Sequence, residues 1–332
     1  MKALLSQASG GPDTLVLGEL PIPEPKPVEI RIRVRACGVN YPDTLMIEDK
    51  YQFQPPRPFA PGGEVAGEVD AIGAEVSDFK VGDRVIGLVG FGGMAEYVVT
   101  KATKCVLMPA AMPYDEAAAF IFTYGTSYHA LKQRASLREG ETLLVLGAGG
   151  GVGLAAVEIG RAMGARVIAA ASSAEKADLA IAHGADTAVI YPAGPFDKPA
   201  AKALAEQFKH ACGTTGADVV YDAVGGDYAE AALRATAWEG RFLVVGFPAG
   251  IPRIPLNLAL LKGCQIVGVF WGAFAERDAT TNQRNNRELI DLYTKGALKP
   301  HVSARFSLAG AGVAIKALAE RKALGKLVVV LE

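Results

Sequence analysis

The chain has 332 residues, half of them hydrophobic, which is enough length for about two domains with sizeable cores. Its 34 basic and 35 acidic residues leave a formal net charge of -1, so it has no basic surplus of the kind that attracts nucleic acid or anionic membrane. A small neutral partner is favoured instead. Polar Ser6 and Gln7 follow the first residues too early for a signal-peptide core, and no apolar run approaches a membrane span, so we expect a cytoplasmic protein.

Short strands separated by glycine-rich or proline-rich turns are predicted in the first third of the chain. Apolar and charged residues alternate from Val28 to Ala36, which is typical of a half-buried strand. Further strands are expected at 64–72, 84–88 and 95–99. This region therefore resembles a compact, mostly antiparallel β domain in its pattern.

The pattern changes after about Ala117. A helical stretch at 128–133 precedes an alternation of apolar strands with helices, which predicts a parallel, doubly wound sheet. Helices at 284–295 and 311–322 and a last strand at 327–331 follow, and this last part is expected to return to the first domain. The six strands that we expect in the parallel sheet are 143–146, 166–171, 187–190, 219–222, 242–246 and 266–271.

A glycine turn stands between the first of these strands and the helix after it, in the order Ala148-x-Gly150-x-x-Gly153. Glycines at such a turn let the backbone approach phosphate oxygens, and the helix start stabilises the negative charge. Alanine occupies the place of the usual first glycine. The turn predicts a dinucleotide site, and its alternative is an ordinary strand-turn-helix unit.

The cysteines and histidines show no metal-ligand spacing. Cys37, Cys105, Cys212 and Cys264 stand far apart without a Cys-x-x-Cys pair, so we expect free thiols rather than disulfides or metal ligands. The four histidines are equally scattered. We expect no metal site.

Several segments together resemble the zinc-independent, quinone oxidoreductase-like branch of the medium-chain dehydrogenases/reductases. The likeness covers nearly the whole chain. It implies an α/β protein with a GroES-like, mostly β catalytic domain at 1–122 and 273–332, and a Rossmann dinucleotide-binding domain at 123–272 with a six-stranded sheet. The substrate is expected in the cleft between the domains. The segments are 36–43, 61–67, 81–87, 93–97, 123–131, 148–153, 222–226 and 268–272.

The same resemblance shows which zinc ligands are missing. Zinc alcohol dehydrogenases of this superfamily would carry a cysteine at Asn40 and a histidine at Gly63. Without a Lewis acid to polarise a carbonyl, the acceptor must already be electrophilic, as a quinone or an enone is.

The end of the second parallel strand indicates the cofactor. An NAD-selective fold usually has an acidic residue there, whereas this chain has Ser172 and Ser173, with Lys176 in the next helix. Hydroxyl donors and a cation favour the 2′-phosphate of NADPH, and Tyr191 matches a position that contacts this phosphate in relatives. The alternative is a plain helix start with a solvated lysine.

The resemblance also implies a nicotinamide site, whose role is to orient the ring. Asn40 is expected to be catalytic as well as cofactor-binding. Asp222 resembles a position near the cofactor, where a structural role is an equal alternative. The remaining expected cofactor contacts are Thr126, Gly151, Val152, Val224, Gly246, Phe247, Val269, Phe270 and Trp271.

Tyr51 is the other catalytic candidate. It matches a tyrosine that lines the substrate pocket in quinone reductases and donates a proton in enoyl-thioester reductases. A phenol is protonated at neutral pH and can hydrogen-bond a developing enolate or quinol oxygen. The alternatives are a packing aromatic for Tyr51, and a turn cap rather than an acid or base for Asp43.

The function expected from these residues is NADPH-dependent reduction of a quinone by an enzyme of the NADPH:quinone oxidoreductase type. One alternative is reduction of an activated C=C bond in an enone, alkenal or enoyl-CoA. A second is a crystallin-like protein that binds NADPH without turnover. The resemblance also implies a homodimer formed through the last Rossmann strand, Gln265 to Trp271.

Overall fold

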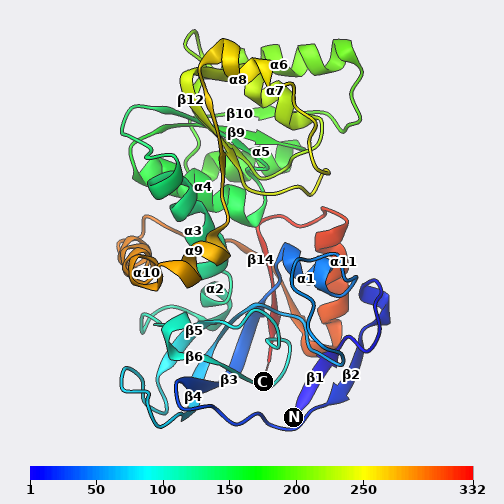
Figure 1. Ribbon diagram of the computed structural model, residues 1–332, viewed down its shortest axis with the longest axis vertical. Helices are drawn as coiled ribbons and strands as arrows, with labels where there is room; N and C mark the ends of the chain where they lie inside the picture. The colour runs from blue at the N-terminus through cyan, green and yellow to red at the C-terminus, as the bar shows by residue number, and fades with distance from the viewer. Residues whose placement is uncertain (332) are drawn as a thin grey trace. The chain divides into compact units, whose positions relative to one another are not determined.

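The computed structural model describes residues 1–331 (Figure 1). The chain divides into two compact units, each of which is built around its own sheet. Unit 1 comprises 1–122, 286–291 and 300–332, and unit 2 comprises 123–285 and 292–299. Helices α3 (Ile121–Tyr128) and α10 (Ala279–Thr294) contain residues of both units.

Unit 1 contains a seven-stranded sheet in the order β14-β15-β3-β4-β5-β7, with β6 also paired to β3. The expected alternation is confirmed in β3, where Ile30, Ile32 and Val34 are buried in the core. All its pairs except β14 with β15 are antiparallel. The strands are β3 (Glu29–Gly38), β4 (Glu64–Ile72), β5 (Arg84–Leu88), β6 (Tyr97–Lys101), β7 (Cys105–Leu107), β14 (Val302–Ser307) and β15 (Lys326–Val330).

Smaller elements complete unit 1. A two-stranded sheet joins the N-terminal strands, and α11 packs near α1. The strand expected at 95–99 begins two residues later, at Tyr97. Ala95 forms a bridge with Ala3, and Glu96 donates its N–H to the Lys2 carbonyl while its own carbonyl accepts the Val34 N–H. These elements are β1 (Lys2–Leu5), β2 (Val16–Glu19), α1 (Tyr41–Met46), α2 (Tyr114–Ala117), α11 (Ala311–Ala319) and the 3-10 turns η1 (Pro12–Thr14), η2 (Ala102–Lys104) and η4 (Leu308–Gly310).

Unit 2 contains the expected parallel sheet of six strands, in the order β10-β9-β8-β11-β12-β13. Strand β8 is buried on both faces, which explains its continuous apolar run. Leu144 and Leu146 face a core shared with α6 and α7. The strands are β8 (Thr142–Leu146), β9 (Arg166–Ala171), β10 (Thr187–Ile190), β11 (Ala217–Asp222), β12 (Thr236–Val244) and β13 (Gln265–Gly268).

The helices of unit 2 alternate with these strands (Figure 1). The helix expected at 128–133 is instead the end of α3 followed by a π-helical turn, η3 (His129–Arg134). The other helices are α4 (Gly151–Ala162), α5 (Ala174–Ala182), α6 (Lys198–Cys212), α7 (Tyr228–Ala235), α8 (Asn257–Lys262) and α9 (Trp271–Arg277).

The strand expected at 266–271 was wrong in its end. Strand β13 ends at Gly268, and Trp271 begins α9 rather than ending the strand. Residues 273–285 and 292–299, expected in the first domain, lie in unit 2. Hydrogen bonds hold them there, because Asn285 pairs with Gln133 and the Lys299 N–H donates to Glu158.

Candidate functional site

The glycine turn connects β8 to α4. Gly147 adopts a left-handed φ of 73°, which glycine tolerates best, whereas Ala148 is not among the residues with positive φ. The Ala148 N–H donates to the Ala170 carbonyl, and Ala148 is fully buried. Alanine is therefore compatible with the first motif position because the left-handed residue precedes it.

Two glycines of the turn allow close approach. A Cβ on Gly153 would lie 2.1 Å from the Gly147 carbonyl oxygen, and one on Gly149 would lie 2.5 Å from Cβ of Lys176. Gly150 is the N-terminal cap of α4. The first N–H groups of a helix have no acceptor within it and attract anions, so this turn fits a dinucleotide pyrophosphate.

Two linked hydroxyl groups, one of which bonds to the first turn of α4, hold that turn in place. Ser127 Oγ on α3 donates to the Val152 carbonyl at 2.8 Å and lies 2.9 Å from the Tyr221 hydroxyl on β11. Because Ser127 uses its hydrogen on Val152, the Tyr221 hydroxyl is the donor in the second contact. The segment from Gly151 to Gly153 is thus held by neighbouring elements.

The serines after β9 have different roles. The Lys176 N–H donates to Ser173 Oγ at 3.3 Å, so Ser173 caps α5. Ser172 is exposed, and the stem of Lys176 packs against Gly149 of the glycine turn. The helix-start interpretation therefore describes Ser173, while Lys176 lies against the glycine turn and Ser172 is exposed at the end of β9.

Tyr191 is buried, with 5 % of its surface exposed, in the core of unit 2. Its ring centroid lies 4.8 Å from that of Tyr228. A packing role therefore accompanies the phosphate contact that the resemblance implies.

The carboxyl ends of β11, β12 and β13 carry the other expected cofactor residues. Asp222 Oδ1 accepts N–H groups of Val224 and Gly225, both at 2.9 Å. Burial raises the pKa of Asp222 to about 6 in spite of these bonds. Phe247, which is exposed, and Gly246 follow β12, and Val269 donates its N–H to Val244.

Trp271 is buried and serves packing. Its ring lies against Gly125, where an added Cβ would be 2.6 Å from the ring, and its indole N–H donates to Asn282 at 3.0 Å. Phe270, by contrast, is exposed, and Thr126 follows Gly125 on α3. At Trp271, the backbone rather than the side chain therefore remains the candidate for the cofactor contact.

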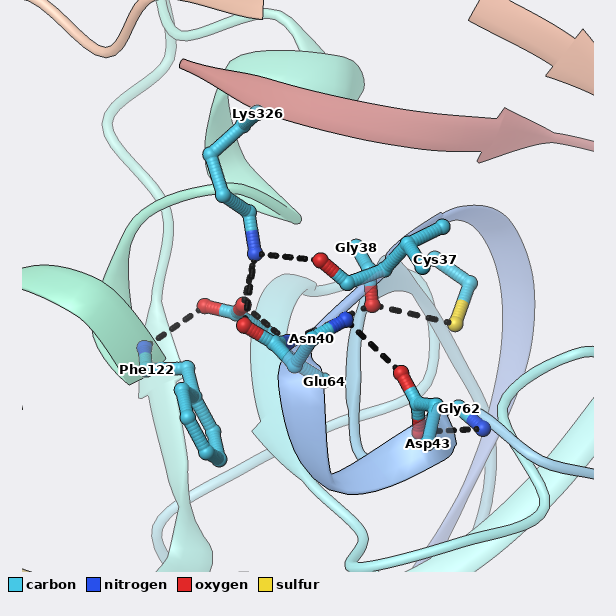
Figure 2. A network of polar contacts seen from close by, with 9 residues as sticks. Cys37, Gly38, Asn40, Asp43, Gly62, Glu64, Phe122 and Lys326 are labelled. Carbon is cyan, nitrogen blue, oxygen red and sulfur yellow. Dashed lines mark hydrogen bonds and ion pairs between the residues drawn. The ribbon is translucent and has the colours of Figure 1, made fainter. Parts of the chain in front are cut away.

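In unit 1, Asn40 lies in a buried polar network (Figure 2). Its Oδ1 accepts from Lys326 Nζ at 2.7 Å, and its Nδ2 donates to Glu64 Oε2 at 3.2 Å and to the Gly38 carbonyl at 3.3 Å. Glu64 Oε1 accepts the Phe122 N–H at 2.7 Å. Burial raises the pKa of Glu64, and the Lys326 charge opposes this effect.

Asp43 joins this network as a cap, one of the two expected alternatives. Its carboxylate accepts the N–H of Asn40 at 2.7 Å, which completes a capping box at the start of α1, and the N–H of Gly62 at 3.0 Å. Burial raises the pKa of Asp43 to about 6. The carboxylate thus ties α1 to the 61–63 turn.

The two positions at which zinc ligands are expected to be missing, Asn40 and Gly63, lie in this region. Asn40 offers an amide that is engaged with three partners, and a Cβ on Gly63 would already be 3.0 Å from the Gly90 carbonyl. No group of three His, Cys, Asp or Glu residues within 1–331 could hold a metal ion. The cysteines are free, and all but the partly exposed Cys264 are buried.

Tyr51 lies in the loop after α1 and is partly buried against the core of unit 1. Burial, and to a smaller extent the charge of Asp43, raises its pKa above the ordinary value of 10.0. The phenol is therefore protonated at neutral pH. Nearby in sequence, Phe53 is exposed and its ring centroid lies 5.8 Å from that of Phe91.

The sequence patterns did not indicate Glu64, Lys326 or the Phe53–Phe91 pair. A buried lysine in an apolar strand, Lys326 in Lys-Leu-Val-Val-Val, was the signal that could have found the network. The structure brings Asn40 together with Asp43 in unit 1, and Ser172 and Lys176 stand at the helix beside the glycine turn in unit 2.

The chain matches two family models and several named proteins. Residues 26–110 match the alcohol dehydrogenase GroES-like domain, and residues 151–291 match the zinc-binding dehydrogenase family. The bovine quinone oxidoreductase-like protein 2 is 38 % identical over 298 residues, 89 % of this chain and 83 % of that protein. Quinone oxidoreductase of Pseudomonas aeruginosa is 35 % identical over 98 % of both chains.

The chain belongs to the zinc-independent, quinone oxidoreductase-like family of medium-chain dehydrogenases/reductases. Two solved structures similar to it are complexes with NADPH. One is Escherichia coli quinone oxidoreductase, with a TM-score of 0.90, 27 % identity and full coverage of both chains. The other is a mycobacterial protein with a TM-score of 0.92, 30 % identity and full coverage of both chains. This member of the family is an oxidoreductase with a GroES-like domain and a Rossmann-type sheet.

Proposed function

We propose that this oxidoreductase binds NADPH and reduces a quinone without zinc. The observation that carries the proposal is the glycine turn, where Gly153 meets the Gly147 carbonyl so closely that only a glycine fits. Two structural relatives are complexes with NADPH, which supports the same cofactor here. Ser172 and Lys176, with no carboxylate at the end of β9, supply donors and a positive charge for a 2′-phosphate.

The residues of the chain bind and orient rather than activate a metal. When bound, the reduced nicotinamide supplies the hydride. The N-terminus of α4 holds the pyrophosphate, and Thr126, Val224, Gly246, Phe247 and the backbone of 269–271 orient the ring. Tyr51, with its raised pKa, keeps a proton that its hydroxyl can donate to the reduced oxygen. Hydride and proton together convert a quinone to its hydroquinone.

A panel of acceptors tests this function. Purified protein is assayed with NADPH against 1,4-benzoquinones, 9,10-phenanthrenequinone, alkenals and crotonyl-CoA. Turnover of quinones at higher kcat/KM than the other classes supports the proposal. Preference for alkenals or crotonyl-CoA assigns reduction of an activated C=C bond instead, and NADPH binding without any turnover assigns the non-catalytic, crystallin-like role.

We also propose a homodimer formed through β13, which is an edge strand of the parallel sheet. Exposed apolar side chains lie on the elements that flank this strand in the chain, with Trp238 on β12, Leu260 on α8 and Phe270 two residues after β13. An edge strand beside such side chains favours pairing with a second copy. Light scattering that gives twice the 34.7 kDa chain mass supports the dimer, and a monomer overturns it.

No helix within the described part of the chain is long and apolar enough to cross a membrane. The small quinone or enone is the only further partner proposed, with no role for nucleic acid. The cytoplasm is the proposed location, and fractionation of cells that express a tagged chain tests it.

A further inference from the structure

The first N–H groups of α4 are available to bind an anion. The first hydrogen bond of the helix runs from the Leu154 N–H to the Gly150 carbonyl at 2.8 Å. Within the described part of the chain, the N–H groups of Gly151, Val152 and Gly153 have no acceptor. The proposed function assigns the cofactor pyrophosphate to these groups. Their strength as donors therefore affects cofactor affinity directly.

A chain of two buried hydroxyl groups ends on one of these peptides. The Val152 carbonyl can only accept a hydrogen bond, so the 2.8 Å contact makes Ser127 its donor. Ser127 Oγ then receives the hydrogen of the Tyr221 hydroxyl, 2.9 Å away. Burial raises the pKa of Tyr221 above its ordinary value, so this phenol keeps its proton. Both side chains are fully buried, and any effect they have on a ligand must pass through the Val152 peptide.

The strand register places Tyr221 on the face of the sheet that α4 covers. Tyr221 of β11 lies opposite Val145 of β8, and residues paired in this way share a face. A Cβ on Gly160 of α4 would lie 2.6 Å from the Leu143 side chain, so Leu143 faces this helix. Val145 points to the same side, because side chains alternate along a strand. The ring of Tyr221 therefore extends toward α3 and α4 rather than into the core shared with α6 and α7.

The direction of the hydrogen bonds matters for the anion. A donor on a carbonyl oxygen draws electron density from the peptide and makes the N–H of the same peptide a stronger donor. The Val152 carbonyl and the Gly153 N–H belong to one peptide group. The hydrogen bonds therefore run in one direction, from Tyr221 through Ser127 to this peptide. Each bond in such a chain strengthens the next by about 10–30 %.

We propose that Ser127 and Tyr221 are positioning residues that strengthen the Gly153 N–H as a donor to the cofactor pyrophosphate. The inference deepens the proposed function and rests on it, because it takes NADPH as the cofactor. Ser127 acts through the Val152 peptide, and Tyr221 acts through Ser127. Both residues belong to unit 2, as the glycine turn does.

The test compares two ligands that differ in the pyrophosphate. The first, 2′-phospho-ADP-ribose, carries the adenosine, the 2′-phosphate and the pyrophosphate of NADPH, whereas adenosine 2′-monophosphate lacks the pyrophosphate. Dissociation constants are measured by isothermal titration calorimetry for the wild type, Y221F, S127A and the double variant, together with thermal unfolding. Y124F is the matched control, because it removes another buried hydroxyl of α3, which donates to Glu158 farther along α4.

We expect S127A to weaken binding of 2′-phospho-ADP-ribose about fivefold and Y221F about twofold, with binding of adenosine 2′-monophosphate unchanged. The double variant should bind as S127A does, because Tyr221 has no effect once the Ser127 hydroxyl is gone. Stability should follow a different order. S127A leaves the buried Tyr221 hydroxyl without an acceptor and should unfold at the lowest temperature, whereas the double variant removes both partners and should recover part of this loss.

Affinity that follows stability overturns the inference. Such a result would be equal weakening of both ligands, or affinity in the double variant that returns toward the wild type. Unchanged affinity in Y221F and S127A overturns it as well. Y124F should lose stability and keep the wild-type ratio of the two dissociation constants, and a change in this ratio as large as in S127A also overturns the inference. If S127A does not fold, the double variant takes its place, with the same fivefold loss expected.

Failure of the proposed function gives a different result. If the wild type prefers 2′-phospho-ADP-ribose over adenosine 2′-monophosphate and the variants behave as expected, but no quinone is reduced, the positioning role stands and quinone reduction falls. If the wild type shows no such preference, the turn does not hold the pyrophosphate, and the positioning role and the cofactor site fall together. If the wild type and all variants show the same preference, only the positioning role falls.

Discussion

A Cβ atom on Gly153 would lie 2.1 Å from the carbonyl oxygen of Gly147, and 2.7 Å from its carbonyl carbon. Both positions are backbone, so no side-chain rotation relieves the clash. The start of α4 and the end of β8 can approach this closely only when residue 153 is glycine.

The first prediction concerns this contact. G153A should displace the first turn of α4, lower the free energy of unfolding by about 1–3 kcal/mol, and weaken NADPH binding at least tenfold. Fluorescence titration and thermal unfolding measure the two effects. The control is G310A, whose Cβ would be no closer than 3.6 Å to its neighbours. NADPH affinity equal to that of the wild type in G153A would show that the turn does not hold the phosphates.

The second prediction concerns cofactor choice. K176M keeps the stem that packs against Gly149 and removes the charge. Because a charge-assisted hydrogen bond contributes about 1.5–3 kcal/mol, we expect NADPH affinity to fall at least tenfold and NADH affinity to change less than twofold. Parallel titrations with both cofactors measure this. Equal losses for both, or a wild type that prefers NADH, would contradict the assignment.

The third prediction concerns Tyr51. Y51F removes the hydroxyl, and we expect kcat to fall by about 10²-fold with little change in the KM for NADPH. Because the pKa of Tyr51 is raised above 10.0, its proton should remain through pH 9, and wild-type kcat should not fall with loss of this proton. Steady-state kinetics across pH 6–9 measure both.

Tyr97→Phe is the matched control for Y51F, because Tyr97 contacts the Arg31 guanidinium through its ring, which phenylalanine keeps. If kcat of Y51F equals that of the wild type on every accepted substrate, Tyr51 is a packing residue, which is the alternative that its sequence position left open.

The fourth prediction concerns pH and Asp222. Its pKa is about 6 in the folded protein and 3.8 ordinarily, so the folded state holds a proton that the unfolded state has released between these values. This contribution to stability is full below pH 3.8 and is lost as pH rises through 6. D222N keeps an amide oxygen for the N–H groups of Val224 and Gly225 and removes the charge.

D222N should therefore gain stability relative to wild type as pH rises from 4 to 7, by about 2 kcal/mol in total. Denaturant unfolding at several pH values measures the difference. The exposed Asp178→Asn on α5 removes the same charge and should show no such trend. A constant difference between D222N and wild type over this range would contradict the raised pKa.

The sequence predicted most of unit 2 because its strands are continuous apolar runs with helices between them. Strands β9 and β10 have the predicted bounds, and the six-stranded parallel order is confirmed. The end of the sheet was predicted less well. Apolar residues continue from Ile266 to Trp271, but the last of them pack as the start of a helix, and periodicity cannot separate these two states over so few residues.

The site in unit 1 was only partly predictable for a different reason. Asn40 was found through its resemblance to a zinc-ligand position, but its partners are distant in sequence, at Glu64 and Lys326. Strand pairing brings them together, and pairing is a property of the register between strands rather than of local pattern. Ser173 differs, because the helix start, which was the alternative to a cofactor contact there, depends on residues adjacent in sequence.

The carboxylate of Glu64 has one oxygen on Phe122, the residue where the chain leaves its first segment, and the other on Asn40 and Lys326. Substitution of Glu64 therefore removes both the contact with the Phe122 N–H and the contacts with Asn40 and Lys326. Substitution of Asn40 or Lys326 affects only the second oxygen of the carboxylate. Glu64 thus links the buried polar network to the end of the first chain segment.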